Sequence, residues 1–408
     1  MSALLLIGGI LMLPSLAQFA MRAAPSPSAV PASLALAHLK ATPGRFAATL
    51  AAVVASVSLM VSMAIMVASF RQSLDDWLGV MLPADLYLRT ATDSAYFTVD
   101  DQRAIARLRG VARAEFMRVT SVSVDRAQPR VVLLARDIEA HDAASRLALV
   151  GASITPPPGA APPAWISEAV ADRRTLAAGR TLTLPIAGRN VAFTVAGVWR
   201  DYARQQGAIV IERARYRELT GDDTVNEAAL WLAPGARAAD VRDGVAARAG
   251  DPARVQMATP GDLRALSLAT FDRTFAVTYA LEAAAVVIGL VGLSAALVAQ
   301  TLARSREFGM LRHVGMTRRQ IGAMLAIEGA ALAAIGVAAG LALGFAISLV
   351  LIHVVNRQSF HWGMDLHVPW LTLAVLASTL LALATLTARL SARGATSVAA
   401  VRAVREDW

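Results

Sequence analysis

The sequence predicts an α-helical membrane protein with an extracytoplasmic α/β domain. Two observations lead to this fold class: 56% of the 408 residues are hydrophobic against 17% charged, and the apolar residues gather in long runs on both sides of a polar middle region. One water-soluble core cannot bury that much apolar surface, whereas a lipid bilayer can accommodate it. About 20 apolar residues cross a bilayer, and five stretches are predicted to be transmembrane helices: 3–21, 47–69, 274–302, 321–355 and 368–388.

The basic residues indicate how these spans are oriented. Segment 71–273 is nearly neutral, with 26 arginines against 24 acids, whereas the rest of the chain holds 13 basic and 6 acidic residues. Most of this excess lies in short segments next to the spans, so the net charge of +9 reflects membrane topology and not a surface that binds nucleic acid. Because basic loops stay in the cytoplasm, five spans place segment 71–273 and loop 356–367 outside it.

The residues that catalysis would need are missing from the sequence. The chain has no cysteine, which excludes disulfides and thiolate metal sites. It has no G-x-x-x-x-G-K-S/T loop for phosphates, and its single lysine, Lys40, lies in an apolar helical context. The hydrolase motifs G-x-S-x-G and H-E-x-x-H are absent as well. We therefore expect a non-catalytic membrane subunit with no cofactor and no metal.

The N-terminal region combines a predicted span with a helix at the membrane surface. No basic residues precede the first apolar stretch and no clear cleavage site follows it, so we expect a retained helix, with a cleaved signal peptide as the alternative. The proline-rich segment 23–32 is typical of a linker. Segment 33–45 has the pattern of a short amphipathic helix in the cytoplasmic interface, and Pro43 and Gly44 turn the chain into the second span.

The polar middle region is typical of a two-lobed α/β domain. Alternating and β-branched runs predict strands at 84–89, 119–124, 130–135, 181–184, 191–198, 208–211 and 228–232. Helices are predicted at 98–108, 165–171, 212–219 and 238–247. A proline cluster at 156–163 is expected to separate the two lobes. The expected domains are residues 1–32, 33–70, 71–273, 274–392 with a cytoplasmic connection at 303–320, and a cytoplasmic tail at 393–408.

The connection between the third and fourth spans carries the most specific local pattern. Residues 305–314 are predicted to form a short helix, Gly315 suits the left-handed position that ends a helix, and Thr317 with Gln320 forms a capping box for the next one. A short helix tied to two spans can be pushed by a soluble motor protein. The contacts would come from Phe308, Met310 and Leu311 and from Arg306, Glu307 and Arg312. On the residues alone, a basic loop that only obeys the positive-inside rule is the alternative.

The run from Arg306 to Ile321, REFGMLRHVGMTRRQI, resembles the R-E-x-x-x-L-R-x-x-G-x-x-x-x-Q-I signature in the coupling segment of FtsX-like permeases of the MacB and LolCE type. The resemblance covers nearly the whole chain beyond residue 33. It implies an ABC-type permease of the bacterial inner membrane that docks a separate ATPase subunit and transmits ATP-driven closure to the outer domain. With Met310 and Thr317 added from the local pattern, the ATPase-coupling residues would be Arg306, Glu307, Gly309, Met310, Leu311, Arg312, Gly315, Thr317 and Gln320.

The same resemblance implies partners outside this chain. The usual four-span member begins in the cytoplasm, whereas this chain has an additional leading span, as in the second half of a ten-span member. We therefore expect a second permease half or a homodimer partner, besides the ABC ATPase subunit, membrane lipids and an extracytoplasmic substrate or protein. The substrate would be a lipid, a lipoprotein or a peptide. The alternative is a membrane-anchored sensor or scaffold that regulates an extracytoplasmic partner without ATP coupling.

The fourth predicted span has two unusual properties. As a helix of ~1.5 Å per residue, stretch 321–355 would exceed the ~30 Å core of a bilayer, so it must tilt, bend or protrude. It also contains Gly336, Gly340 and Gly344, which recur every four residues and permit close helix contact. That contact would lie inside one subunit or between two.

Two groups of polar residues near or within the spans are further candidates. Glu282 and Glu328 are costly inside a bilayer, so each should face protein, water or the interface. For Glu328 we expect an internal hydrogen bond or a contact with Arg318 or Arg319, with a proton relay as the alternative. The outer loop matches no zinc motif and is predicted to form an aromatic and polar belt at the membrane interface, with Trp362, Asp365, His361 and His367.

Overall fold

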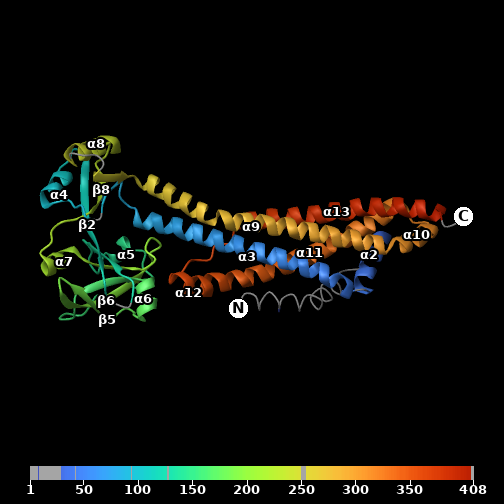
Figure 1. Ribbon diagram of the computed structural model, residues 1–408, viewed down its shortest axis with the longest axis horizontal. Coiled ribbons are helices and arrows are strands. Elements are labelled where there is room, and N and C mark those ends of the chain that lie inside the picture. Colours follow the sequence, from blue (N-terminus) through green and yellow to red (C-terminus); the bar gives the residue numbers. More distant parts are fainter. Residues whose placement is uncertain are drawn as a thin grey trace. The chain divides into compact units, whose positions relative to one another are not determined.

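The computed structural model describes residues 8, 29–41, 43–92, 94–125, 128–249 and 254–405. Apart from Gly8, the span predicted at 3–21 lies outside the described residues. The chain divides into two compact units, whose elements are labelled in Figure 1. A helical unit comprises residues up to Ser69, Thr274–Val354 and residues from Leu366 onward, and an α/β unit comprises Phe70–Arg273 and Val355–Asp365.

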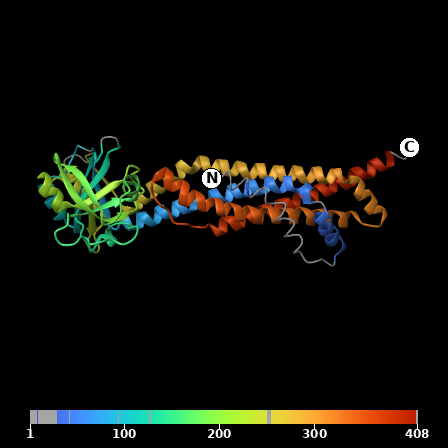
Figure 2. The same ribbon diagram turned by 90° about the horizontal axis from the view of Figure 1, so that it is seen from below.

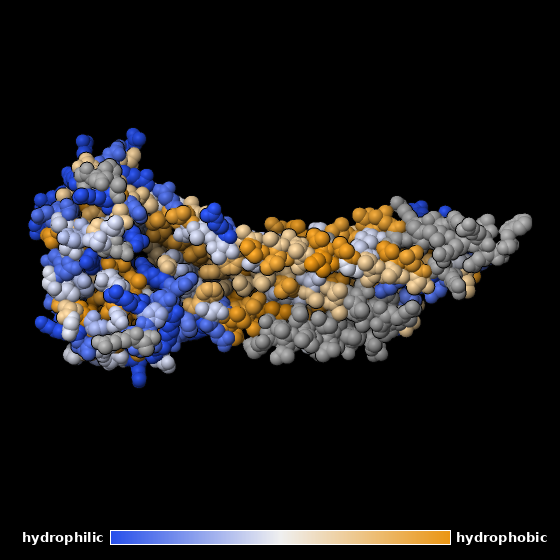
Figure 3. Space-filling model, in the orientation of Figure 1, coloured by the Kyte–Doolittle hydropathy of each residue, from blue (hydrophilic) through white to orange (hydrophobic). Residues whose placement is uncertain are grey.

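The helical unit is built from long apolar helices. Its elements belong to α2 Val30–Ala41, α3 Pro43–Met81, α9 Pro260–Ala303, α10 Ser305–His313, α11 Arg318–Val350 and α13 Trp370–Arg405. In the described chain, four segments are long and apolar enough to cross a membrane: Leu50–Met81, Pro260–Ala303, Arg318–Phe360 and Trp370–Leu390. These segments overlap four of the five predicted spans. The long helices α3, α9, α11 and α13 run alongside one another in both ribbon views (Figure 2), and hydrophobic side chains dominate their visible face (Figure 3).

The span predicted at 321–355 continues beyond its own α-helix. A π-helical segment, η2, follows α11 at Leu351–Val355, and α12 follows at Asn356–Phe360. His361 then adopts a left-handed conformation with φ of 60° and ends the helix. The chain beyond α11 therefore leads through η2 into α12, which belongs to the α/β unit.

The α/β unit contains a nine-stranded sheet in the order β5-β6-β4-β7-β3-β2-β8-β1-β9. The strands are β1 Leu86–Thr90, β2 Val111–Val122, β3 Val131–Arg136, β4 Pro163–Ser167, β5 Thr181–Ile186, β6 Arg189–Trp199, β7 Ala208–Glu212, β8 Glu227–Leu232 and β9 Val255–Ala258. The helices are α4 Val99–Ala106, α5 Ala143–Arg146, α6 Glu168–Arg174, α7 Arg213–Thr220 and α8 Ala238–Ala249. Central strands are buried along their length, whereas β5 alternates between exposed and buried residues, as a strand at the edge of a sheet should.

The two lobes meet along one strand and not at the prolines. The first half of β2 pairs with β8, and its second half pairs with β3. β8 also pairs with β1, so the chain starts the first lobe, leaves it along β2 and returns to it with β8 and β9. The expectation that prolines 156–163 separate the lobes is therefore wrong. These prolines lie inside the second lobe, ahead of β4, because strand pairing over long sequence distances defines the lobes.

One predicted helix begins too early. Residues 165–171 were expected to be helical, but Trp165, Ile166 and Ser167 are the end of β4, and α6 starts at Glu168. A short apolar run is compatible with a buried strand as well as with a helix. Trp165 belongs to β4 and its side chain is fully buried in the core of the lobe, so this run is a buried strand. The short strand β9 and the single-turn helix α5 were not predicted at all.

Three glycines bring α11 close to α3. A Cβ atom at Gly336, Gly340 or Gly344 would approach a side chain of α3 to between 2.6 and 2.8 Å, at Val53, Val57 and Val61 respectively. Real Cβ atoms do not come that close, so only glycine permits this distance between the two backbones. The stripe of small residues therefore serves packing inside the chain.

We expect Gly340→Ala to lower the thermal unfolding temperature of the detergent-solubilised chain. The new methyl group would overlap Val57, and overpacking of this kind costs about 1–3 kcal/mol. Gly292→Ala is the matched control, because a Cβ atom at Gly292 of α9 meets no atom within 4 Å. Equal unfolding temperatures for the two variants would contradict the assigned packing.

Candidate functional site

Helix α10 joins α9 to α11 and is closed at its C-terminal end by a tight turn. Gly315 has a φ of 101°, and two hydrogen bonds complete a Schellman motif: Met316 N–H donates to Leu311 O (3.0 Å) and Gly315 N–H donates to Arg312 O (3.1 Å). The next helix starts with the predicted capping box, in which Thr317 and Gln320 exchange hydrogen bonds. The predicted turn chemistry is confirmed, and it fixes the direction of α10 relative to α11.

The inner face of α10 is buried against its own chain. Phe308 is 1% exposed and packs with Ile321, Met324 and Leu325 of α11 and with Ala35 of α2. Leu311 and Met316 pack against the same cluster. Phe308 is therefore not available to a partner, because it anchors the helix inside the chain, whereas Leu311 is half-buried and its coupling role stays a prediction.

The outer face of α10 presents a different set of residues. Met310 is 66% and Val314 is 85% exposed, and they lie four residues apart on one face of the helix. Glu307, Arg312 and His313 are exposed beside them. Of the residues predicted to contact a motor, Met310, Arg312 and Glu307 face outward, and the side chain of Arg306 lies outside the described part of the structure. Val314 was missed, although its spacing from Met310 was visible in the sequence.

The remaining predicted residues serve the shape of the segment. Gly315, Thr317 and Gln320 form the turn and the helix cap described above. At Gly309, a Cβ atom would meet nothing within 4 Å. The geometry of α10 therefore does not require glycine at this position.

A buried ion cluster forms at the corner between α9 and α10. Arg304 is 8% exposed, and its Nη1 donates to Glu328 Oε2 (2.8 Å) while its Nε donates to Glu307 Oε2 (2.9 Å). Its guanidinium carbon lies 5.3 Å from the centre of the Phe308 ring. On the other side, Nδ1 of His38 from α2 lies 3.5 Å from Glu328 Oε1. One cluster thus holds α2, the start of α10 and the interior of α11.

The expected internal hydrogen bond of Glu328 is present, whereas the alternative contact with Arg318 or Arg319 is not. Arg318 and Arg319 do not contact it and are exposed, because they stand at the start of α11, more than two turns before Glu328. The chain reversal after α10 brings Arg304 to it instead. Glu282 of α9 is half-buried, and the described residues offer it no ion-pair partner. No group of three His, Asp or Glu side chains in the described chain is placed to hold a metal ion.

The loop 355–365, at the other end of α11, folds onto the second lobe of the α/β unit. Trp362 is 4% exposed and packs with Trp77 and Tyr202, its ring 5.6 Å from that of Tyr202 in an edge-on arrangement. Burial raises the pKa of the Tyr202 hydroxyl to about 12, so this hydroxyl stays protonated and donates to Gly363 O at 2.9 Å. The expected belt at the membrane interface is wrong for Trp362, because this residue belongs to a protein core.

Polar contacts fasten the same loop at several further points. Gly363 N–H donates to Glu168 Oε2 (3.0 Å), and Arg200 Nη1 donates to Asp365 Oδ2 (2.8 Å). The ion pair between Arg357 and Asp172 (3.0 Å) adds a contact to α6. The loop is therefore held by α6 and by the segment that follows β6, both in the second lobe.

Comparisons with known proteins match most of the chain. The family model described as FtsX-like permease C-terminal matches residues 280–399, and the one described as MacB-like periplasmic core domain matches residues 46–248. An uncharacterized ABC transporter permease protein of Mycobacterium tuberculosis is 31% identical over 332 residues. The match covers 79% of this chain and 39% of that relative, so the chain spans well under half of the relative's length.

Two solved structures also match the chain. One is the extracellular domain of YknZ, a noncanonic ABC-type transporter from Gram-positive bacteria, with 13% identity and a TM-score of 0.30 over 43% of this chain and 100% of that one. The other is the periplasmic region of MacB from Actinobacillus actinomycetemcomitans, with 10% identity and a TM-score of 0.34 over 46% of this chain and 94% of that one.

We expect Arg304→Met to destabilise the helical unit strongly. It leaves the Glu328 carboxylate buried without its cation, and breaking a buried pair on one side costs about 3–5 kcal/mol. The double variant Arg304→Met with Glu328→Leu should regain most of that loss, whereas Arg319→Met at an exposed position should change little. Thermal unfolding in detergent of the native chain, Arg304→Met, Glu328→Leu and the double variant measures this cycle, and strictly additive losses would argue against the pair.

Removing the indole ring of Trp362 should release the loop 355–365. Trp362→Ala leaves a cavity between Trp77 and Tyr202, and such truncations cost about 3–5 kcal/mol. Hydrogen exchange at the Gly363 amide is expected to rise at least about tenfold. Trp370→Ala, at a side chain that is 73% exposed, is the control and should leave that exchange rate unchanged. Unaltered protection in Trp362→Ala would show that the loop is held without the aromatic cluster.

Proposed function

Because the chain belongs to the FtsX-like family of ABC transporter permeases, we propose that it converts ATP hydrolysis by a separate ATPase subunit into movement of its extracytoplasmic α/β domain. Membership of the family confirms the resemblance read from residues 306–321. The chain is accordingly a multi-pass protein of the cytoplasmic membrane, with a MacB-like α/β domain outside the cytoplasm. Members of this family are generally non-catalytic subunits.

The observation that carries the proposal is that the two faces of α10 differ: one is buried in the chain and the other is exposed. One face of the helix is held inside the chain by Phe308 and by the corner cluster at Arg304. The opposite face exposes Met310 and Val314 beside charged residues. An apolar pair with a charged rim is the composition expected of a docking surface for another protein. A helix held this firmly would pass a push on its outer face to α11.

The route from α10 to the outer domain follows the chain itself. α11 begins three residues after Gly315, at Arg318, and the chain continues through η2 and α12 into the loop 355–365. The contacts of that loop with Glu168, Tyr202 and Asp172 fasten it to the second lobe. Helices α3 and α9 are unbroken from the helical unit into the α/β unit. Movement of α10 would thus reach the outer domain through three continuous helices.

We further propose that the complex contains a second permease unit, either a different half or another copy of this chain. The relative of this chain from Mycobacterium tuberculosis is much longer than the matched region. The unmatched part of that relative is long enough to contain a second permease unit. The substrate class that fits the family is a lipid, a lipoprotein or a peptide at the outer face of the membrane. A sensor or scaffold without ATP coupling is the second candidate function, and the following experiment separates the two.

Binding of the cognate ABC ATPase should depend on the outer face of α10. In pull-downs with the tagged full-length chain, Met310→Asp and Val314→Asp are each expected to weaken the association at least about tenfold, which is about 1.4 kcal/mol. Leu311→Asp is a poorer test, since Leu311 packs against the inner cluster.

Val150→Asp is the matched control, because it places the same charge at an exposed valine of the α/β unit. This variant should bind the ATPase as tightly as the native chain does. It should also stimulate ATP turnover by the ATPase to the same extent. If the native chain fails to bind the ATPase at all, the coupling function is rejected and the scaffold function stands.

A further inference from the structure

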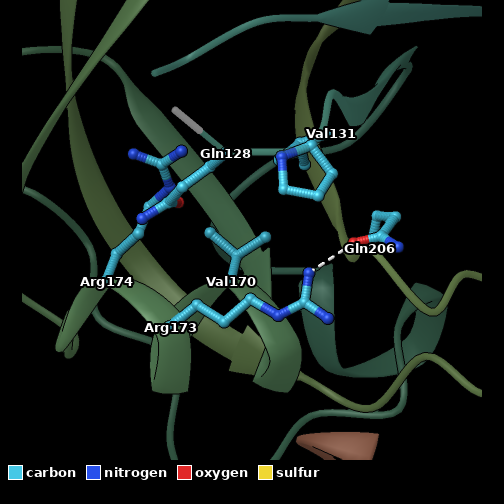
Figure 4. Close-up of a pocket in the computed structure, with 7 residues that line it drawn as sticks. Gln128, Val131, Val170, Arg173, Arg174 and Gln206 are labelled. Carbon is cyan, nitrogen blue, oxygen red and sulfur yellow. Dashed lines mark hydrogen bonds between the residues drawn. The ribbon is translucent and has the colours of Figure 1, made fainter. Parts of the chain in front are cut away.

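The second lobe of the α/β unit carries a cleft lined by arginines. The cleft has a volume of about 450 Å³ and lies between the start of β3, helix α6 and the turn before β7. Figure 4 shows the side chains of Arg173 and Arg174 extending from α6 on either side of Val170. Val170 and Val131, which belong to the core of the lobe, form its apolar floor. We call this feature the arginine cleft.

Among the described residues, the two guanidinium groups in the arginine cleft have no charged partner. Arg173 donates from Nη1 to Gln206 Oε1 (2.5 Å) and from Nη2 to Gln205 O (3.2 Å), so neutral oxygens hold it in place. Arg174 has its Nη2 atom buried with no hydrogen-bond partner among the described residues. No carboxylate lines the described part of the cleft. The cleft therefore holds two positive charges that this part of the chain does not neutralise.

Neighbouring arginines of the same unit behave differently. Arg200 pairs with Glu168 and Asp365, Arg204 pairs with Asp201, and Arg357 pairs with Asp172. Asp172 lies next to Arg173 in α6, yet it serves the loop 355–365 and not the cleft. Each of these three arginines is neutralised by at least one carboxylate. Arg173 and Arg174 therefore remain available to an anionic ligand from outside the described chain.

We propose that the arginine cleft binds the phosphate group of an extracytoplasmic ligand. Guanidinium groups match phosphate oxygens with two parallel hydrogen bonds each, and two adjacent groups balance the charge of a phosphate better than that of a single carboxylate. The amides of Gln128 and Gln206 add neutral hydrogen-bonding groups at the rim. The valine floor favours a ligand with an apolar portion next to its phosphate, and the volume fits a group the size of a lipid headgroup.

The phosphate could belong to a lipid headgroup or to a soluble phosphate ester, and two probes separate these sources. The purified full-length chain in a non-ionic detergent is titrated calorimetrically with glycerol 3-phosphate and with dihexanoyl phosphatidylglycerol below its micellar concentration. Glycerol and a short peptide with a free terminal carboxylate are titrated alongside. This proposal goes beyond ATP coupling and does not depend on it, because no ATPase is present in the measurement.

The native chain should bind at least one phosphate probe, and Arg173→Met with Arg174→Met should weaken that binding at least about tenfold. Tighter binding of the lipid identifies a headgroup, and equal binding identifies a soluble ester. Arg180→Met with Arg189→Met is the matched control, since it removes two exposed arginines of the same lobe outside the cleft. This control should bind like the native chain. Thermal unfolding of both double variants checks that the lobe remains folded.

Three results would overturn the proposal. The first is that neither phosphate probe binds the native chain at millimolar concentration. The second is that the folded Arg173→Met and Arg174→Met double variant binds a phosphate probe as well as the native chain does. The third is that the carboxylate peptide binds in the cleft and the phosphate probes do not, which would assign the site to a peptide.

Discussion

The close packing of α11 on α3 is the contact on which the rest of the helical unit depends. In a bilayer, two helices gain nothing by hiding apolar side chains from lipid, because lipid chains are equally apolar. They gain dispersion energy only where their backbones approach closely. The glycine stripe of α11 allows this approach, and each glycine receives a valine of α3. Valine has few side-chain rotamers, so the contact is stiff as well as close.

A stiff α11 would connect the structures at its two ends, which are the ion cluster around Arg304 and the loop 355–365. At its start, the buried pair of Arg304 and Glu328 adds little net stability, since desolvation offsets most of the attraction between two buried charges. Its value lies in geometry, because a buried guanidinium has few positions in which its charge and its N–H donors are satisfied. At the other end, aromatic packing around Trp362 holds the loop 355–365. The corner is thus fixed by charge, and the outer end by shape.

Local features of this fold were predictable from the sequence, and long-range partners were not. The turn at Gly315 and the cap at Thr317 follow from residue chemistry within a few positions, and the structure reproduces both. The partner of Glu328 could not be read, because Arg304 meets it only after the chain reverses. Trp362 is ambiguous in principle, since an amphipathic aromatic side chain suits a membrane interface and a protein core alike.

Helix α10 shows the same limit within a single element. It is apolar on two faces, with Phe308 and Leu311 on one and Met310 and Val314 on the other. Periodicity indicates that such a helix has faces, but it does not say which one the rest of the chain covers. That choice depends on Ala35 and Ile321, which lie in other helices. The sequence therefore located the helix but could not say which of its faces packs inside the chain.

The way the two lobes share β2 determines how the α/β unit would respond to a force applied to one lobe. The pairing partner of β2 changes from β8 to β3 between Met117 and Arg118. At this change the buried side chain of Asn226 replaces a strand, because its Oδ1 accepts from Val119 N–H (2.7 Å) and its Nδ2 donates to Val119 O (2.8 Å). Nearby, Glu115 of β2 accepts a hydrogen bond from Arg146 Nη1 (2.8 Å) of the second lobe. A joint closed in this way resists bending, so a pull on the second lobe would carry the first lobe with it instead of opening the two like jaws.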